Sequence, residues 1–333
     1  MSELRKDPIV GRWVIISPER GKRPSDYASR KTEKKEGFCP LCPGNESLTP
    51  PEVFAFRKDR TDPDGPGWNI RVVPNKFPAL SSEGETNRQC VGIYDKMNGI
   101  GAHEVVIETP DHGAELPNLP LSSIKKILFV FKMRTEELAK DPRFRYIVIF
   151  KNRGLEAGAS LQHSHSQIIA LPIVPKRILE ELKGGKRYYR DHDRCIFCEM
   201  IEQEAQLGMR LIEENKDFVS FSPFAARFPF ETWILPRFHA SSYSTIRQPQ
   251  YQTLAEILSS TLKRLDEVLV EPPYNMVFHT APIMDEELPY FHWHIEIIPK
   301  VTRVAGFEWG TGFYINPTPP EQSAAYLREV ALS

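Results

Sequence analysis

Apolar residues recur every three or four positions along two long stretches of this chain. One stretch is "LSSIKKILFVFKMRTEELAK" (121–140), and the other is "YQTLAEILSSTLKRLDEVL" (251–269). This spacing places the apolar side chains on one face of a helix, so each stretch predicts an amphipathic helix that covers a core. Shorter runs rich in valine, isoleucine and aromatic residues flank both stretches and predict strands.

These predicted elements occur twice in the same order. Three pairs of segments match at nearly constant spacing: "AHEVVIETPDH" (102–112) with "PFETWILPRFH" (229–239), "YIVIFKN" (146–152) with "YNMVFHT" (274–280), and "HSHSQIIALP" (163–172) with "HWHIEIIPK" (292–300). Each half also carries a C-x-x-C pair ahead of these segments. We therefore expect an α+β fold of two repeats, whose antiparallel strands form one extended curved sheet (a half-barrel) with helices packed on it, rather than a parallel βαβ fold.

The segment between the repeats is rich in proline and charged residues, which makes it the natural boundary. We expect an N-terminal domain over residues 1–172, a linker over 173–194 and a C-terminal domain over 195–333. In the last domain, a loop rich in glycine and proline precedes a short amphipathic helix that should begin near Pro320.

Charge and composition argue against several classes of function. The 43 basic and 44 acidic residues are interspersed and give a net charge of −1, so neither nucleic acid nor an anionic membrane surface is an expected partner. No run approaches the roughly 20 apolar residues that span a bilayer, and the N-terminal residues lack the apolar core of a signal peptide. We expect a cytoplasmic protein.

Four of the five cysteines form two C-x-x-C pairs, and Cys90 is expected to be a partly buried free thiol. In a reducing compartment such pairs bind metal more often than they form disulfides. A structural zinc site needs four cysteine or histidine ligands, and the repeat completes each pair with two histidines at matching places. The expected ligands of two zinc ions are Cys39, Cys42, His112 and His163 for the first, and Cys195, Cys198, His239 and His292 for the second.

Alternatives remain open for some of these histidines. His112 and His239 could simply end strands at the surface. His279, which the repeat aligns with Lys151, is either a buried hydrogen-bonded residue or another ligand of the second site, and His294 is a further candidate there.

The stretch "LQHSHSQ" (161–167) carries the densest group of reactive side chains. On a strand, residues two apart share a face, so His163, His165 and Gln167 project together. Ser164 and Ser166 point the other way and are expected on the wet face of the strand.

The loop ahead of this strand, "NRGLEAGAS" (152–160), has the composition of a phosphate-binding loop. Gly154 and Gly158 allow the backbone to approach a ligand closely, while Asn152 and Ser160 can donate hydrogen bonds. The spacing does not match a Walker A motif, and no lysine follows the glycines.

The combined pattern N-x-G-x-x-x-G-A-S-x-x-H-x-H-x-Q resembles the active-site signature of the galactose-1-phosphate uridylyltransferase branch of the histidine triad superfamily. "SPERGKRP", "VVPNKFPAL", "TPDH" and the later H-x-H are similar to other marks of that branch, so the resemblance covers nearly the whole chain. Within the branch, the sequence looks like the plant enzymes described as ADP-glucose phosphorylases. The resemblance implies that both repeats have the histidine triad fold.

The resemblance also implies a mechanism. His165 would attack the α-phosphorus of a nucleoside diphosphate sugar and become a covalent nucleotidyl-histidine, and a second, phosphate-bearing substrate would then accept the nucleotidyl group in a ping-pong cycle. Gln167 and Ser160 would donate hydrogen bonds to the phosphate groups. Hydrolases of the superfamily carry a third histidine at the place of Gln167, so a transferase is favoured over a hydrolase.

Further residues match binding positions of the family. Asn75 and Phe77 match the nucleoside pocket, and Asn152 and Gly158 match residues around the phosphates. Arg20 and Arg23 match basic residues that reach substrate phosphate from a neighbouring subunit, which implies a homodimer; a solvated basic loop is the alternative.

Two departures from the family pattern bear on the reaction. Ser164 stands where the family has proline, and we expect little effect because its side chain faces away from the site. Gly306, Thr311 and Gly312 stand where the uridylyltransferases contact the hexose. We therefore expect ADP-glucose and phosphate to give glucose 1-phosphate and ADP, with UDP-glucose:hexose-1-phosphate uridylyltransferase of galactose metabolism as the alternative.

Overall fold

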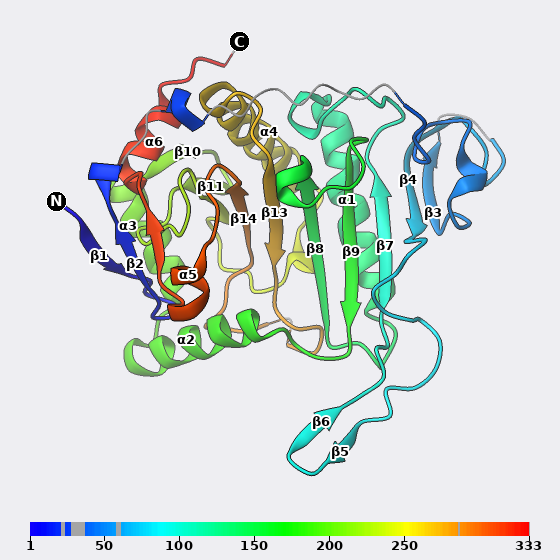
Figure 1. Ribbon diagram of the computed structural model, residues 1–333, viewed down its shortest axis with the longest axis horizontal. Helices are drawn as coiled ribbons and strands as arrows, with labels where there is room; N and C mark the ends of the chain where they lie inside the picture. Colours follow the sequence, from blue (N-terminus) through cyan, green and yellow to red (C-terminus); the bar gives the residue numbers. More distant parts are fainter. Residues whose placement is uncertain (21–23, 28–36, 58–60, 286, 333) are drawn as a thin grey trace.

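One ten-stranded open sheet runs through both halves of the chain (Figure 1). The computed structural model describes residues 1–20, 24–27, 37–57, 61–285 and 287–332. Across the sheet, the strands are β10 (Leu211–Glu214), β11 (Phe218–Phe221), β12 (Thr232–Pro236), β14 (His294–Pro299), β13 (Tyr274–His279), β8 (Tyr146–Arg153), β9 (His165–Leu171), β7 (Ala102–Ile107), β4 (Trp68–Pro74) and β3 (Phe54–Arg57). Every neighbouring pair is antiparallel, which confirms the predicted α+β fold with one extended sheet.

The two predicted amphipathic helices are α1 (Leu121–Leu138) and α4 (Gln250–Leu269), and both pack on the same face of the sheet. The other helices are α2 (Lys176–His192), α3 (Ile196–Leu207), α5 (Gly306–Thr311) and α6 (Pro320–Arg328), with short 3₁₀ turns at η1 (Pro18–Arg20), η2 (Pro24–Tyr27), η3 (Glu46–Leu48), η4 (Leu116–Asn118), η5 (Leu155–Ala157) and η6 (Tyr243–Thr245). The helix predicted near Pro320 is therefore α6. None of the helices in the described part of the chain is both long enough and apolar enough to cross a membrane.

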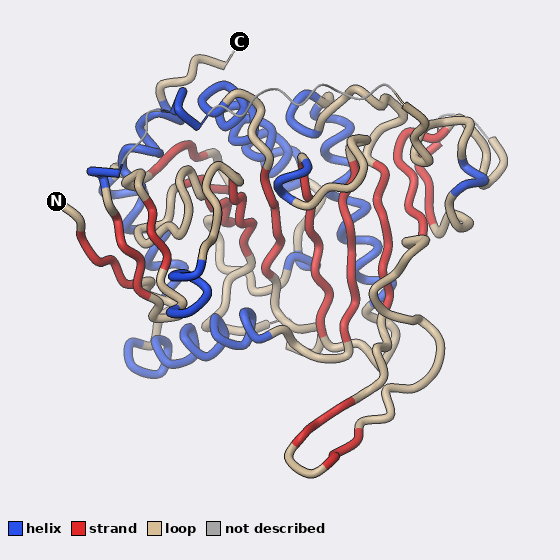
Figure 2. The backbone as a smooth tube through the Cα atoms, in the orientation of Figure 1, coloured by secondary structure: helices blue, strands red, loops and turns tan. Residues whose placement is uncertain are grey.

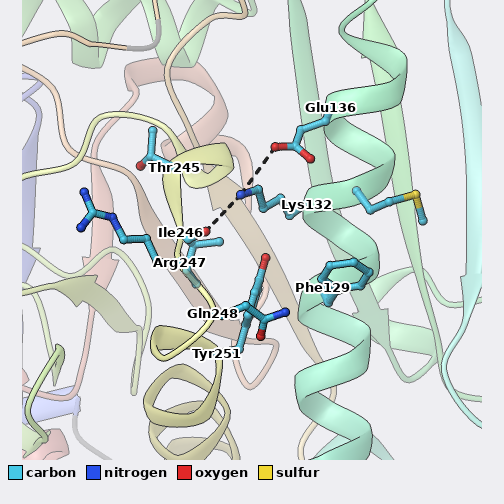
Figure 3. Close-up of a pocket in the computed structure, with 9 residues that line it drawn as sticks. Phe129, Lys132, Glu136, Thr245, Ile246, Arg247, Gln248 and Tyr251 are labelled. Atoms are coloured by element: carbon cyan, nitrogen blue, oxygen red, sulfur yellow. Dashed lines mark hydrogen bonds and ion pairs between the residues drawn. The ribbon is translucent and has the colours of Figure 1, made fainter.

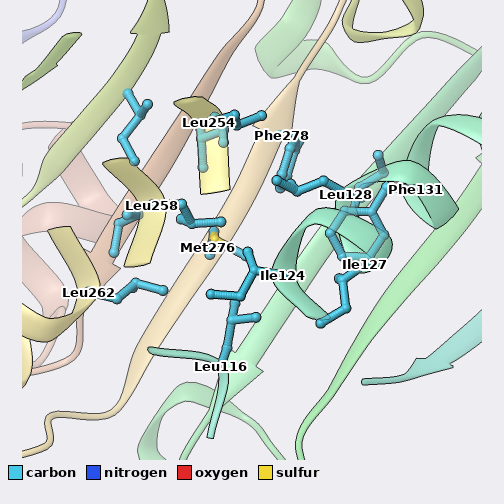
Figure 4. Packing of buried hydrophobic residues seen from close by; sticks show 14 of the residues in the cluster. Leu116, Ile124, Ile127, Leu128, Phe131, Leu254, Leu258, Leu262, Met276 and Phe278 are labelled. Atoms are coloured by element: carbon cyan, nitrogen blue, oxygen red, sulfur yellow. The ribbon is translucent and has the colours of Figure 1, made fainter. Parts of the chain in front are cut away.

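The main core lies between these two helices and the sheet, and it joins the halves (Figure 4). The apolar stripes of the helices meet the inward-facing residues of β13; the labelled core includes Ile124, Leu128, Phe131, Leu254, Leu258, Leu262, Met276 and Phe278. Burying one such side chain contributes about 1.5–3 kcal/mol. The apolar side chains whose spacing predicted the helices thus also form the core that joins the two repeats.

The repeats are related by a pseudo-twofold arrangement around the β13–β8 pair. The sheet register corrects the sequence alignment by one residue here. Phe150 and Val277 hold equivalent places, because they pair with equivalent residues of β9 and β14. The equivalent of His279 is therefore Asn152, and the alignment with Lys151 was wrong; a slip of one residue turns a side chain to the other face of a strand.

The segment predicted as a linker is mostly helix. Helix α2 packs closely enough that a Cβ atom on Gly184 would lie 1.9 Å from the carbonyl oxygen of Ile9. The charged residues that indicated a linker are the exposed face of this helix, while Ile178, Glu181 and its two glycines are buried. The division into two domains stays a prediction, since one sheet joins both halves.

Two smaller sheets lie beside the main one (Figure 2). Strands β1 (Glu3–Lys6), β2 (Trp13–Ile16) and β15 (Tyr314–Asn316) form the first, over the second half of the chain. Strands β5 (Gln89–Val91) and β6 (Tyr94–Lys96) form a hairpin that projects from the body of the molecule. Cys90 lies on this hairpin and is exposed, so the expectation of a partly buried thiol was wrong.

Candidate active site and metal centres

The open face of the first repeat presents His165, the first residue of β9. Its Nδ1 donates a hydrogen bond to the carbonyl oxygen of His163, 2.7 Å away, so Nε2 keeps its lone pair. Burial lowers the pKa of His165, although the bond to His163 acts in the opposite direction. The ring is therefore a neutral, oriented imidazole, as a nucleophile near pH 7 requires.

Gln167 lies two residues further along the same face, and its orientation is set by His103, a residue that the sequence reasoning missed. Nε2 of His103 lies 2.8 Å from Oε1 of Gln167 and 3.1 Å from Nδ2 of Asn75, while the Ala79 N–H points at Nδ1 from 3.5 Å. The contact from Ala79 favours a ring proton on Nε2, which then donates to Oε1 of Gln167. The amide nitrogen of Gln167 is thereby left to donate to a ligand. The alternation of β7, which puts His103 on the face of Val105 and Ile107, is the signal that could have revealed it.

Asn75 joins this group from the end of β4. Its backbone N–H donates to the carbonyl oxygen of His103 at 2.7 Å, and its side-chain oxygen accepts from the N–H of Phe77 at 2.9 Å. The Phe77 ring is 84% exposed and can stack on a ligand base. The structure thus brings Asn75 and Gln167 to one place through His103, with Phe77 at its rim.

The predicted phosphate loop leads from β8 into β9. Gly154 and Gly158 have φ angles of +80° and +88°, a region that favours glycine. Asn275, from the second repeat, donates to the side-chain oxygen of Asn152 and to the carbonyl oxygen of Ala157, both at 2.8 Å. The Asn152 side chain is therefore oriented by its oxygen, and its amide nitrogen faces Gly158. Ser160 is exposed on the same loop.

Arg20, the first of the two predicted N-terminal arginines, is not part of this group. Arg20 is exposed in η1, which follows β2 in the small sheet over the second half, away from β9 in Figure 1. Arg23 lies outside the described residues. A contribution of either arginine to a neighbouring subunit stays a prediction.

The four residues predicted as ligands of the first metal ion lie close together. Cys39, Cys42, His112 and His163 offer ligand atoms that all lie within 4.8 Å of one another. Sγ of Cys42 lies 3.3 Å from Nδ1 of His112 and 3.5 Å from Nδ1 of His163. These distances match the edge of about 3.5 Å that a zinc tetrahedron with sulfur and nitrogen ligands has. Nε2 of His163 donates to the carbonyl oxygen of Thr109 at 2.7 Å, which orients Nδ1 toward the centre.

The second centre repeats this geometry with Cys195, Cys198, His239 and His292. Sγ of Cys198 lies 3.4 Å from Nδ1 of His239 and 3.7 Å from Nδ1 of His292. Each of these histidines also donates Nε2–H to a backbone carbonyl, Leu288 for the first and Pro236 for the second. The cysteine pair begins helix α3, which the sequence reasoning did not predict. Both donor sets therefore fit zinc.

His279 and His294 lie in a separate cluster rather than in the second centre. With Glu181 and Glu296, they form a fully buried group whose ligand atoms lie within 4.8 Å. Nδ1 of His279 bonds to Glu181 at 2.9 Å, and burial lowers the pKa of His294 to about 4. Glu181 comes from the segment predicted as a linker, so its place in this cluster could not be predicted from the sequence.

This cluster occupies the place in the second repeat that the candidate active site has in the first. His294 corresponds to His165, and its Nδ1 donates to a carbonyl in the same way, at 3.1 Å. Helix α2 covers it, and Trp233 stacks on its ring at 4.9 Å between centroids. Arg227 and Arg177 each bond to a carboxylate oxygen of Glu296 at 2.7 Å. His294 is therefore fully buried at 0% exposure, while His165 keeps 8%.

Ser164 and Ser166 are not on a wet face, and that expectation was wrong. Both are buried on the helix side of the sheet, where they donate hydrogen bonds to Glu108. Lys151 lies beside them and pairs with Glu108. On the helix side of the sheet, β9 is therefore part of a buried network of charged and hydroxyl groups.

A separate cavity of about 300 Å³ lies between α1 and the segment that leads into α4 (Figure 3). Its lining residues are Phe129, Lys132, Met133, Glu136, Thr245, Ile246, Arg247, Gln248 and Tyr251. Lys132 bonds to the carbonyl oxygen of Ile246 on the other wall and pairs with Glu136 one turn further along α1. The candidate catalytic residues of the described chain are on the opposite face of the sheet, so this cavity is not their site.

Comparisons with known proteins match both halves of the chain. Residues 1–175 match the family model described as galactose-1-phosphate uridyl transferase, N-terminal domain, and residues 181–329 match that of the C-terminal domain. ADP-glucose phosphorylase from Arabidopsis thaliana is 40% identical over 99% of this chain and 93% of its own length. Galactose-1-phosphate uridylyltransferase from Thermotoga maritima is 34% identical over 99% of this chain and 98% of its own length.

Solved structures agree with these matches. A crystal structure of the Arabidopsis thaliana ADP-glucose phosphorylase with bound ADP-glucose has a TM-score of 0.85 and 39% identity, and the match covers 100% of both chains. A structure of a uridylyltransferase has a TM-score of 0.77 and 32% identity, over 98% of this chain and 97% of that one.

Proposed function

Because the chain belongs to the galactose-1-phosphate uridyl transferase family, we propose that it is a nucleotidyltransferase that works through a covalent nucleotidyl group on His165. The observation that carries the proposal is the hydrogen bond from Nδ1 of His165 to the His163 carbonyl, which leaves Nε2 as the nucleophilic atom on the open face. Gln167, oriented by His103, supplies the adjacent hydrogen-bond donor.

The two half-reactions follow from this geometry. Nε2 of His165 attacks the α-phosphorus of the nucleoside diphosphate sugar, and the bond from that phosphorus to the bridging oxygen breaks, releasing the sugar 1-phosphate. Nδ1 keeps its proton and its bond to the His163 carbonyl, so the positive charge of the adduct is stabilised. An oxygen of the acceptor phosphate then attacks the same phosphorus, the nitrogen–phosphorus bond breaks, and the neutral ring returns.

The side chains around His165 have separate parts in this scheme. The amide of Gln167 donates to a phosphoryl oxygen as negative charge builds there. Asn152, Gly158 and Ser160 hold the phosphates from the loop. Phe77 stacks on the base beside Asn75.

We propose ADP-glucose and inorganic phosphate as substrates, with glucose 1-phosphate and ADP as products. The similarity to a protein named ADP-glucose phosphorylase over 99% of the chain supports this choice. The small residues Gly306, Thr311 and Gly312, where uridylyltransferases contact the hexose, support a small acceptor. The uridylyltransferase reaction with UDP-glucose is the second candidate, because a relative with that name is 34% identical.

We also propose that each Cys2His2 centre holds one zinc ion, in a structural role. Such ions stabilise the segments that carry their ligands and need no open coordination position. The proposed enzyme is cytoplasmic, does not bind nucleic acid, and forms a homodimer in which Arg20 and Arg23 reach the partner's substrate phosphate.

A comparison of substrate pairs tests the reaction. The protein is incubated with ADP-glucose and phosphate, with UDP-glucose and galactose 1-phosphate, or with either sugar nucleotide alone, and the products are separated by chromatography. We expect glucose 1-phosphate and ADP from the first pair at the highest rate. Faster turnover of the second pair would favour the uridylyltransferase, and sustained release of AMP without an acceptor would favour a hydrolase.

A further inference from the structure

We propose that Glu108 is a positioning residue that, together with Lys151, holds the backbone on both sides of the nucleophile from the back of the sheet. The inference rests on the proposed function, in which His165 is the nucleophile. Neither residue touches the open face where substrate binds. Their effect on the reaction would act through Ser164 and Ser166, the neighbours of His165 in sequence.

The carboxylate of Glu108 contacts both of these serines. One oxygen accepts from the hydroxyl of Ser164 at 2.6 Å, and the other accepts from the hydroxyl of Ser166 at 2.5 Å. The backbone N–H of Glu108 also donates to the carbonyl oxygen of Ser164 at 3.2 Å. Glu108 is only 1% exposed, so these bonds form where water does not compete.

Lys151 completes the network from the neighbouring strand. Its ammonium group donates to Glu108 at 2.8 Å, to the hydroxyl of Ser164 at 2.9 Å and to the carbonyl oxygen of His165 at 3.1 Å. These three contacts use all three protons of the ammonium group. The carbonyl of the nucleophile itself is therefore tied to a buried cation.

The hydrogen bonds of Glu108 and Lys151 to residues 164–166 affect the orientation of the His165 imidazole. The ring is held by a hydrogen bond from its own Nδ1 to the carbonyl two residues back, so the ring turns if the backbone between His163 and His165 turns. Ser164 is the residue between them. The family pattern has a proline there, whose ring restricts the backbone by itself. In this chain the buried network would supply the restriction instead.

The second repeat shows that the fold does not need these charges. The residues equivalent to Lys151, Ser164 and Ser166 are Phe278, Trp293 and Ile295, by the register of the sheet. All three are apolar and fully buried against the helices. A buried ion pair is often no more stabilising than such apolar residues. The charged network is found under the repeat that carries His165, which points to a role in the reaction of that residue.

The test compares Glu108→Gln with a matched control on the same strand. Glu104 is also buried on the helix side of β7 and accepts two hydrogen bonds from Arg134, at 2.6 and 2.9 Å, but it does not contact the residues around His165. Each variant is mixed with ADP-glucose without acceptor, and the rate of nucleotidyl transfer to His165 is measured over a range of ADP-glucose concentrations.

We expect Glu108→Gln to lower the maximal rate about 10- to 100-fold, since a small misplacement of a reacting group has effects of this size, with little change in the concentration for half-maximal rate. Glu104→Gln should stay within about twofold of the unmodified protein, although both variants lose stability. Adding Ser164→Pro to Glu108→Gln should restore most of the rate, because proline restricts the same backbone.

Other outcomes separate the two proposals. An unchanged rate in Glu108→Gln, or an equal loss in Glu104→Gln, would overturn the positioning role while leaving His165 as nucleophile. Absence of adduct in the unmodified protein would instead overturn the proposed function. If Glu108→Gln does not fold, Ser166→Ala removes one of the two bonds from serine hydroxyls to Glu108 and should lower the same rate by a smaller factor. No loss there would also overturn the role.

Discussion

Nε2 of His103 lies 2.8 Å from the side-chain oxygen of Gln167, and the two residues come from neighbouring strands of the sheet. The Ala79 N–H points at the other nitrogen of His103, which favours the tautomer in which the histidine donates and the amide of Gln167 accepts. Gln167 is thereby prevented from turning its oxygen toward the phosphate. A carboxamide in the flipped orientation would place a lone pair against phosphoryl oxygens instead of a donor.

This relationship predicts a non-additive pair of substitutions. Gln167→Ala should lower kcat about 100-fold, as loss of one donor to a developing charge does. His103→Ala should lower it by less, and the double variant should be no slower than Gln167→Ala alone, because His103 acts through Gln167. Steady-state kinetics of the three variants provide the check. Multiplicative losses would show that His103 acts independently.

Zinc content provides the next prediction. Elemental analysis of the purified protein should give about two zinc ions per chain, since two centres have closed Cys2His2 ligand sets. The paired substitution Cys39→Ala and Cys42→Ala should remove one ion, and Cys195→Ala with Cys198→Ala should remove the other. Each loss should lower the thermal midpoint of unfolding, because metal binding contributes to folding.

His279→Ala is the matched control for the second centre. This residue lies in the neighbouring buried cluster and bonds to Glu181, so the zinc content should not change. A drop to one ion in His279→Ala, together with two ions in the variant that lacks Cys195 and Cys198, would contradict the ligand assignment.

Arg227 should be important for stability but not for zinc or for the nucleophile. It bonds to Glu231 at 2.8 Å and to Glu296 at 2.7 Å, and all three residues are buried. Arg227→Met leaves two buried carboxylates without this partner and should lower the free energy of unfolding by about 3–5 kcal/mol. Denaturant titration measures the change.

An exposed ion pair serves as the control for that experiment. Arg237 and Glu214 pair at the surface, where water screens the interaction, so Arg237→Met should change the free energy of unfolding by at most about 1 kcal/mol. Equal effects of the two substitutions would mean that the buried network is not specially stabilising.

Much of the fold could be predicted from the sequence, because the patterns that indicate it are local or occur twice. The two amphipathic helices were found almost to the residue, since their apolar stripes have the helical period and pack on the sheet. The two Cys2His2 clusters could be predicted because each C-x-x-C pair recurs with histidines at matching places. The repeat itself made one site predict the other.

What the sequence did not reveal depends on contacts between distant segments. Ser164 and Ser166 looked like solvent-facing residues, yet Glu108 and Lys151 satisfy them inside the core. Helix α2 looked like a linker because its exposed face is charged, and only its packing over the second repeat shows that Glu181 belongs to the core. Polar residues alone do not distinguish a solvent-exposed face from a buried face whose polar groups are hydrogen-bonded inside the protein.

The central claim is that His165 carries the nucleotidyl group, and intact-protein mass spectrometry tests it most directly. The protein is incubated with ADP-glucose in the absence of acceptor, denatured and weighed, with UDP-glucose in a parallel sample and His165→Asn as the control. We predict an added AMP on the unmodified protein, none on His165→Asn, and loss of the adduct when phosphate is added. No adduct with either sugar nucleotide, or an adduct that persists in His165→Asn, would contradict the account.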